Sequence, residues 1–180
     1  MDRQFLFLVA SARADGNSER LARRAAAALP SSVTQRWLRL DDHPLPPFVD
    51  VRHDGTFPPA DGALVDATLA ATDLVFVTPV YWYSLPATAK LYLDHWTAWM
   101  RDPALDFRSR MAGRRMWAVI VDASEPDDGT ADPLIGTLTR TADYMSMRWM
   151  GVLHGHGNRP GEALTDAALL AAADRFFTVD

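Results

Sequence analysis

Residues 4–10 read QFLFLVA and lead directly into residues 11–18, which read SARADGNS. A continuous apolar run that stops at small and polar residues is typical of a central strand that is buried on both faces of a parallel sheet. Asn17 or Ser18 can cap a helix, because an amphipathic pattern follows them as far as residue 29. The stretch therefore predicts a strand, a polar loop and a helix, in that order.

The same order of apolar strand and helix recurs along the chain. Further strands are predicted at residues 35–40, 73–78, 115–121 and 152–155, and further helices at residues 64–71, 85–100, 133–150 and 162–177. Prolines crowd residues 41–59, which are predicted to form a long surface loop. Alternating strands and helices favour a parallel sheet with right-handed crossovers and helices on both faces. We expect one α/β domain over residues 1–180, a three-layer sandwich whose pattern permits a flavodoxin-like strand order of 2-1-3-4-5 or a Rossmann order.

The composition narrows the classes of function. The 180 residues include no cysteine, which excludes disulfides, thiolate nucleophiles and cysteine metal sites. The 18 basic residues are outnumbered by 23 acidic ones, and the net charge of −5 opposes binding of nucleic acid over a broad face. The sequence shows neither a signal-peptide pattern nor a run of about 18 apolar residues, so we expect no membrane contact and a cytoplasmic location.

The loop after the first predicted strand has the features of a phosphate site. In open parallel sheets, ligands bind at the carboxyl ends of the strands where the strand order reverses, which in the order 2-1-3-4-5 lies between the first and third strands. This loop offers the N–H groups and positive dipole end of a helix N-terminus, together with the hydroxyls of Ser11 and Ser18. Arg13 adds a positive charge, and Gly16 permits a positive φ. The alternative is a polar turn in which Asn17 or Ser18 only caps the helix.

The loop after the third predicted strand reads PVYWYS over residues 79–84. Tyr81, Trp82 and Tyr83 cannot all face the core at a strand-to-helix turn, so they offer a stacking or edge surface to a planar ligand. The alternative is that these aromatic side chains belong to the core or to a subunit interface. One loop suited to a phosphate and one suited to a flat ring, at neighbouring strands, together specify a ligand shaped like FMN.

These two loops resemble the motifs of a known family, the NAD(P)H-dependent FMN reductases and flavodoxin-like quinone reductases. The resemblance is carried by S-x-R-x-x-G-N-S over residues 11–18 and by PVYWYSLPA over residues 79–87, continued by Lys90 and Asp94. It implies a flavodoxin-like fold that binds FMN, with NADPH or NADH as co-substrate. It also implies a homodimer or homotetramer with the ring near a subunit interface. The implied contacts are Ser11, Arg13, Asn17 and Ser18 to the phosphate, and Pro79, Val80, Tyr81, Trp82, Tyr83 and Ser84 to the edge of the isoalloxazine ring.

The leading hypothesis is an FMN-dependent oxidoreductase that transfers hydride or electrons from NAD(P)H to a small acceptor: a quinone, a nitro or azo compound, or free flavin. The cofactor carries that chemistry, so no catalytic acid or base is assigned. One alternative is a flavodoxin-like interaction module that has lost its cofactor. The other is a flavodoxin-like electron carrier or flavin-binding protein without a nicotinamide site. One departure from the family favours this alternative: many relatives have a glycine-rich turn after the fourth strand, whereas residues 122–129 are acidic and would repel the phosphates of a dinucleotide.

Two smaller features stand outside the two loops. His154 and His156 lie two residues apart on the last predicted strand and so share one of its faces. A metal site there would need a third ligand that the sequence does not identify, so no metal is expected, and one of the two histidines can instead line the ring pocket. Trp96, Trp99 and Met100 form a helical apolar stripe that belongs to the core or to a surface between copies of the chain.

Overall fold

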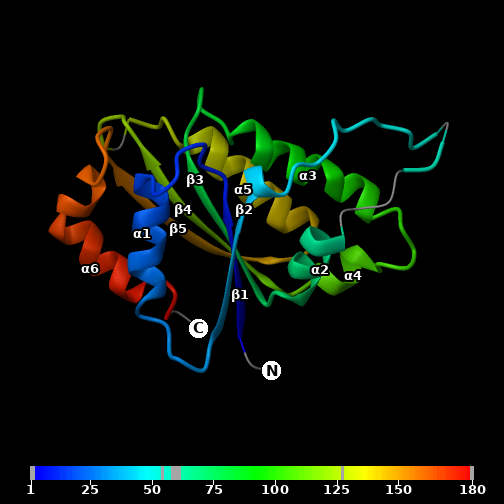
Figure 1. Cartoon of the computed structure of the whole chain (residues 1–180), viewed down its shortest axis with the longest axis horizontal. Helices are drawn as coiled ribbons and strands as arrows, with labels where there is room; N and C mark the ends of the chain where they lie inside the picture. The colour runs from blue at the N-terminus through cyan, green and yellow to red at the C-terminus, as the bar shows by residue number, and fades with distance from the viewer. Residues whose placement is uncertain (1–2, 54, 58–61, 127, 179–180) are drawn as a thin grey trace.

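The structure is a computed structural model that describes residues 3–53, 55–57, 62–126 and 128–178. Its centre is a sheet of five parallel strands in the order β2-β1-β3-β4-β5 (Figure 1). The strands are β1 (Gln4–Val9), β2 (Thr34–Arg39), β3 (Asp73–Pro79), β4 (Arg115–Asp122) and β5 (Arg148–His156). The flavodoxin-like strand order is thereby confirmed, and the Rossmann order is excluded.

The helices form two layers, one on each face of the sheet (Figure 1). Within the described residues they are α1 (Asn17–Ala26), α2 (Gly62–Ala70), α3 (Ala87–Trp99), α4 (Phe107–Met111), α5 (Asp132–Tyr144) and α6 (Ala167–Phe176), with 3-10 turns η1 (Leu40–Asp42) and η2 (Glu162–Thr165). α1 and α6 cover one face, and α2 to α5 cover the other. No helix in this part of the chain has the length and apolar character needed to cross a membrane.

Side chains of each central strand alternate between two apolar cores. In β1, Phe5 and Phe7 pack beneath α1 and α6, where both rings meet Phe177 edge to face. Leu6 points the other way, into the core that also contains Trp99 of α3. All four of these aromatic rings and Leu6 are almost completely buried. Burial on both faces explains why β1 is apolar without interruption, as the sequence pattern predicted.

The helix predicted over residues 133–150 is wrong at its C-terminal end. α5 ends at Tyr144, Ser146 adopts a left-handed backbone with φ of 54°, and the chain then enters β5 beside β4. The N–H of Met147 donates to the carbonyl of Ala142 (2.8 Å) and closes the helix. The error arises because a short apolar run fits a strand as well as it fits a helix.

Other differences concern the ends of elements and one missing helix. The helix predicted over residues 162–177 is divided into η2 and α6 by Asp166, whose carboxylate accepts hydrogen bonds from two N–H groups of the first turn of α6. α4 was not predicted, because five residues are too few to show helical periodicity. The loop predicted over residues 41–59 starts within η1 and has no further helix or strand up to residue 53 or in 55–57; Asp54, Pro58 and Pro59 lie outside the described residues.

Candidate functional site

The loops after β1 and β3 meet at the carboxyl edge of the sheet, as the strand order requires. Between them lies an open cavity of about 270 Å³. Seven of the ten residues predicted to bind the cofactor line this cavity, namely Ser11, Arg13, Asn17, Ser18, Pro79, Val80 and Tyr81. The rest of the wall comes from Ala14, Asp15, Gly16 and Arg20 beside the first loop, and from the ends of β4 and β5 at Val121, Asp122, Ala123, Gly157, Asn158 and Pro160. The sequence singled out the acidic segment that begins at Asp122 but assigned no ligand contact to the residues after β5.

The N-terminus of α1 opens into this cavity. Gly16 occupies the N-cap position, so no side chain caps the first N–H groups of the helix. Uncapped N–H groups at the positive end of a helix dipole are a ready-made site for a phosphate. Ser11 and Ser18 line the same cavity and are only 4% and 3% exposed. Their hydroxyl groups are therefore held in place beside the helix N-terminus rather than solvated.

The positive φ expected at Gly16 is found one residue earlier. Gly16 has φ of −69°, whereas Asp15 has φ of 55°. Gly16 instead provides space, because a Cβ at that position would lie 3.0 Å from Ser11 Oγ. Arg20 supports the left-handed Asp15 by donating to its carbonyl (2.9 Å) and its carboxylate (2.6 Å). The hydrogen bond to the carboxylate holds the pKa of the Asp15 carboxyl below its ordinary value.

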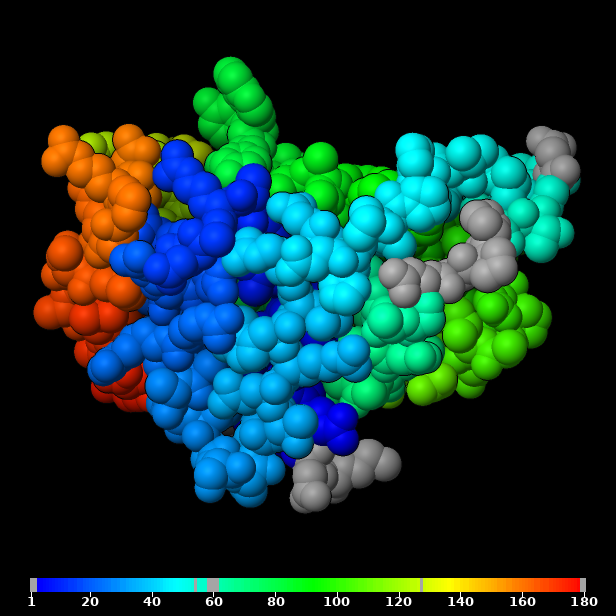
Figure 2. Space-filling view, in the orientation of Figure 1, coloured from blue at the N-terminus to red at the C-terminus, as the bar shows by residue number. Residues whose placement is uncertain are grey.

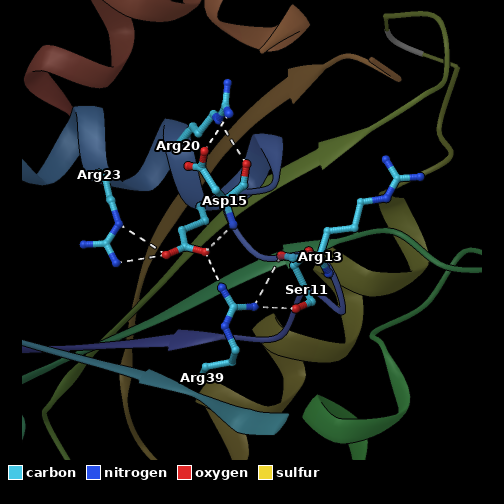
Figure 3. A network of polar contacts seen from close by, with 7 residues as sticks. Ser11, Arg13, Asp15, Arg20, Arg23 and Arg39 are labelled. Carbon is cyan, nitrogen blue, oxygen red and sulfur yellow. Dashed lines mark hydrogen bonds and ion pairs between the residues drawn. The ribbon is translucent and has the colours of Figure 1, made fainter. Parts of the chain in front are cut away.

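A buried carboxylate organises the loop from behind (Figure 3). Glu19 is 7% exposed, and its carboxylate binds the guanidinium groups of Arg23 and Arg39 and accepts from the N–H of Asp15. Arg39 also donates to the carbonyl oxygens of Ser11 (2.7 Å) and Arg13 (3.3 Å). These carbonyl oxygens would repel a phosphate, and Arg39 binds them on the β2 side of the loop. Neither Glu19 nor Arg39 was predicted from the sequence, although Arg39 ends a strand next to β1.

Asn17 joins the phosphate loop to the loop after β5. Its side-chain amide donates to the carbonyl oxygens of Gly157 (3.0 Å) and Arg159 (2.9 Å) and accepts from the N–H of Gly161 (2.6 Å). A Cβ at Gly157 would lie 2.7 Å from the backbone nitrogen of Ala163, so this close approach requires glycine. The Asn17 side chain is thus fully engaged, and what it offers to a ligand is its backbone N–H at the start of α1.

Arg13 is the cation of this loop that no carboxylate neutralises within the described residues. Its side chain is exposed and extends away from the Glu19 network, as Figure 3 shows. By contrast, Arg20, Arg23 and Arg39 each form an ion pair. Arg13 also lines the cavity, so its charge is available to an anion there.

The aromatic loop is a tight turn that projects into solvent. Tyr81 and Ser84 exchange two backbone hydrogen bonds (3.0 and 3.1 Å), and Trp82 and Tyr83 between them have φ of 49° and 62°. Trp82 is 93% exposed and Tyr83 is 58% exposed. In Figure 2 this segment stands out from the surface as a green knob at the top. The three aromatic side chains therefore do not belong to the core of the chain. Trp82, Tyr83 and Ser84, which were predicted to bind the cofactor, are not among the residues that line the cavity.

We expect that replacing Trp82 and Tyr83 by asparagine and glycine will raise the free energy of unfolding by about 1–2 kcal/mol. Two positive φ values are what a type I′ turn requires, and Asn-Gly adopts them with little strain, whereas aromatic residues do not. Little burial is lost, since both side chains are largely exposed. Urea unfolding measures the change, with Trp82→Ala as the control that removes an aromatic ring without relieving strain at Tyr83. A double variant that is no more stable than the wild type would contradict the strain argument.

The acidic segment after β4 contributes one carboxylate to the cavity wall, that of Asp122. Its Oδ1 accepts from the N–H (3.2 Å) and hydroxyl (2.8 Å) of Ser124, and its two oxygens lie 2.9 Å from ring nitrogens of His154 and His156. Burial raises the pKa of Asp122, but hydrogen bonds from Ser124 and His154 outweigh burial and hold the pKa below its ordinary value. Asp127 lies outside the described residues. The Asp122 carboxylate is thus held at the cavity wall by hydrogen bonds to its neighbours, in its charged form.

A larger hollow of about 480 Å³ lies elsewhere, between Arg52 and residues 55–57 on one side and residues 98–105 on the other. Its lining includes none of the ten predicted cofactor residues. The smaller cavity, by contrast, lies where the strand order reverses. It is lined by the uncapped N-terminus of α1 and by the unpaired Arg13. A set of donors for an anion at one end and an aromatic turn at the other fit a phosphorylated ligand with a planar ring, which is the shape of FMN.

Comparison with known proteins agrees with a ligand of this shape. The model of a family described as having a flavodoxin-like fold matches residues 3–177. The chain is 32% identical, over 168 residues, to YwqN of Bacillus subtilis (strain 168), which carries the provisional name of an NAD(P)H-dependent FMN-containing oxidoreductase. The match covers 91% of this chain and 90% of that relative.

Solved structures with the same arrangement include two that span nearly the whole chain. A Trp repressor binding protein from Bacillus subtilis superposes with a TM-score of 0.76 at 26% identity, over 96% of both chains. An FMN-dependent NADH-azoreductase from Bacillus anthracis, in complex with FMN, superposes with a TM-score of 0.69 over 96% of this chain and 99% of its own. At 16% identity, the second similarity is evidence for the fold alone.

Proposed function

The chain belongs to the family with the flavodoxin-like fold, and from this premise we propose that it is an FMN-dependent oxidoreductase. It takes hydride or electrons from NADH or NADPH and passes them to a small acceptor, such as a quinone, a nitro or azo compound, or free flavin. The observation that carries the proposal is the single cavity that is lined both by the uncapped N-terminus of α1 and by Pro79, Val80 and Tyr81, which lead into the aromatic turn. YwqN of Bacillus subtilis, which is similar to this chain over most of its length, is named as an oxidoreductase of the same kind.

At the phosphate end, the protein supplies backbone N–H groups, hydroxyls and one cation. Ser11 and Ser18 would donate hydroxyl groups, and Asn17 and Ser18 would donate the N–H groups that begin α1. Arg13 would add a charge-assisted hydrogen bond from the exposed side of the loop. Because Arg39 binds the carbonyl oxygens of Ser11 and Arg13, the loop is organised before the ligand arrives. Such pre-organisation reduces the entropy lost on binding.

At the ring end, the turn over residues 79–84 would hold the edge of the isoalloxazine. The N–H groups of Tyr81 and Ser84 are used within the turn, so those of Trp82 and Tyr83 are the ones that can reach the polar rim of the ring. Pro79, Val80 and Tyr81 line the adjoining wall. Bound FMN would accept hydride from the nicotinamide and deliver electrons to the acceptor. The chain's own task is to bind the cofactor and orient it.

The absorbance of the purified protein, followed by anaerobic mixing with each nicotinamide, tests the proposal. We expect a flavin spectrum, as purified or after incubation with FMN, that NADH or NADPH bleaches within the stopped-flow time range. A protein that binds FMN but is bleached by neither donor would be an electron carrier or flavin store. A protein that stays colourless in excess FMN would overturn the cofactor assignment as well.

Replacing Arg13 by alanine is expected to weaken FMN binding about tenfold, because one charge-assisted contact to the phosphate is lost at an exposed position. Riboflavin, which lacks the phosphate, should bind equally to both proteins. Fluorescence titration of the apoprotein measures both affinities. Arg36→Ala is a matched control, since Arg36 is an exposed arginine on β2 outside the cavity. Equal FMN affinities of wild type and Arg13→Ala would show that Arg13 is only solvated.

We also propose that the active form is a cytoplasmic homodimer or homotetramer, built as a single flavodoxin-like domain. A hollow between α3 and α5, whose lining combines Leu93, Met100 and Tyr144 with polar side chains, supports a contact between copies, as does the exposed Trp82. A cytoplasmic location agrees with the supply of reduced nicotinamide dinucleotides there. Analytical ultracentrifugation with and without FMN tests the assembly, and a monomer under both conditions would refute it.

A further inference from the structure

Asp122, His154 and His156 converge at the carboxyl ends of β4 and β5. The two strands pair in parallel, with Ile120 opposite His154 and Asp122 opposite His156. Gly155 between the two histidines faces α1 and α6, because a Cβ there would meet Leu21 and Leu169. The two imidazoles therefore project from the opposite face, on the same side of β5 and next to the Asp122 carboxylate. Rigid neighbouring strands thus bring together three side chains that can each bind a metal.

The distances within this His-Asp-His cluster match those between ligands of one ion. His154 Nε2 lies 2.9 Å from Asp122 Oδ2, and His156 Nδ1 lies 2.9 Å from Asp122 Oδ1. The three ligand atoms all lie within 4.8 Å of one another. Neighbouring ligands of a six-coordinate metal with bonds of about 2.1 Å are about 3.0 Å apart. A small closing movement would place all three around one ion.

The carboxylate is oriented independently of the histidines. Ser124 donates to Asp122 Oδ1 through both its N–H and its hydroxyl, which leaves Oδ2 facing His154 as the freer oxygen. Hydrogen bonds of this kind fix a ligating carboxylate in metal sites. The Asp122 side chain is 3% exposed, whereas the side chains of His154 and His156 are 27% and 26% exposed. An ion can thus enter from the solvent side and keep water in its remaining positions.

We propose that Asp122, His154 and His156 form a binding site for a divalent transition-metal ion of the Zn²⁺, Co²⁺ and Ni²⁺ class. Two imidazoles and one carboxylate suit these borderline ions, whereas Mg²⁺ and Ca²⁺ prefer a full set of oxygen ligands. The structure supplies the third ligand that the spacing of the two histidines did not reveal. The proposal does not depend on the oxidoreductase activity, although Asp122 also lines the cofactor cavity.

Isothermal titration calorimetry of the untagged protein with Zn²⁺ tests this site, after chelator treatment and dialysis. We expect saturable binding of a single ion per chain and no heat from Mg²⁺. His154→Ala and His156→Ala should each weaken Zn²⁺ binding about tenfold or more, and the double variant should abolish it. His53→Ala is the matched control, because His53 is an exposed histidine outside the cluster. This variant should bind Zn²⁺ as the wild type does.

Thermal unfolding provides a second measurement that does not rely on FMN or activity. Zn²⁺ should raise the melting temperature of the wild type and of His53→Ala, since an ion that binds the native state stabilises it, but not that of the double variant. Circular dichroism establishes that the variants are folded; both histidines are half-buried at the edge of the sheet. Failure of Zn²⁺ to bind the wild type would overturn the proposal. Undiminished binding to a folded double variant would overturn it as well, and would leave the cluster as a carboxylate hydrogen-bonded to two imidazoles.

Discussion

Replacing Asp73 by alanine is expected to lower the free energy of unfolding by about 3–5 kcal/mol. Asp73 begins β3, is 0% exposed, and accepts from Arg3 (2.7 Å), Thr72 (2.7 Å) and the indole N–H of Trp117 (3.0 Å), with Arg115 at 3.6 Å. Removing the carboxylate leaves two partly buried guanidinium groups without their counter-charge and one buried indole without its acceptor. The cost of such orphaned groups exceeds the net worth of the pair itself.

Urea unfolding and calorimetry measure this loss, which corresponds to a fall of roughly 10 °C in melting temperature for a chain of this size. Asp73→Asn keeps an acceptor and should lie between the alanine variant and the wild type. Asp94→Ala is the control, because Asp94 forms an exposed pair with Lys90 that is worth about 0.5 kcal/mol or less. FMN affinity should be unchanged below the melting temperature, since Asp73 lies at the amino end of the sheet. A wild-type melting curve for Asp73→Ala would refute the argument.

The central strands were predictable because burial on both faces leaves an uninterrupted apolar signature, as in β1 and β3. The boundary between α5 and β5 was not predictable in the same way. Met147 and Trp149 are apolar in either element, and what ends the helix is the left-handed Ser146, which carries no glycine signal. Local composition thus identifies buried elements, while backbone geometry decides where one stops and the next starts.

The candidate site also has a part that the sequence predicts and a part that only the folded chain reveals. The residues of the two loops that line the cavity were predictable, because each follows a recognisable strand at the edge where ligands bind. The groups that shape those loops were not. Glu19 and Arg39 are 20 positions apart and meet only because β2 pairs with β1. Asp122 likewise reaches His154 and His156 through the pairing of β4 with β5. The sequence had pointed to the two histidines and to the acidic segment separately, without indicating that they meet.

Replacing Glu19 by alanine is expected to weaken FMN binding by ten- to a hundredfold, or about 1.4–2.7 kcal/mol, although Glu19 would touch no part of the ligand. The reason is that its carboxylate binds Arg39, which in turn binds the carbonyl oxygens of Ser11 and Arg13 (Figure 3). Without Glu19, the N–H of Asp15 also loses its acceptor. The phosphate loop then has to be ordered by the ligand itself, at the expense of affinity.

The same variant should lose about 2–3 kcal/mol of stability, since Arg39 is 21% exposed and its partner would be gone. Arg24→Ala on the same helix is the control: its ion pair with Asp174 is half exposed on both sides and contributes little to either quantity. Apoprotein titrations with FMN and with riboflavin separate the two effects. A loop disordered as a whole loses affinity for FMN far more than for riboflavin, because the phosphate end depends on it. Equal losses for both ligands would mean that Glu19 supports the fold around the ring instead, and unchanged FMN affinity would show that the loop needs no such support.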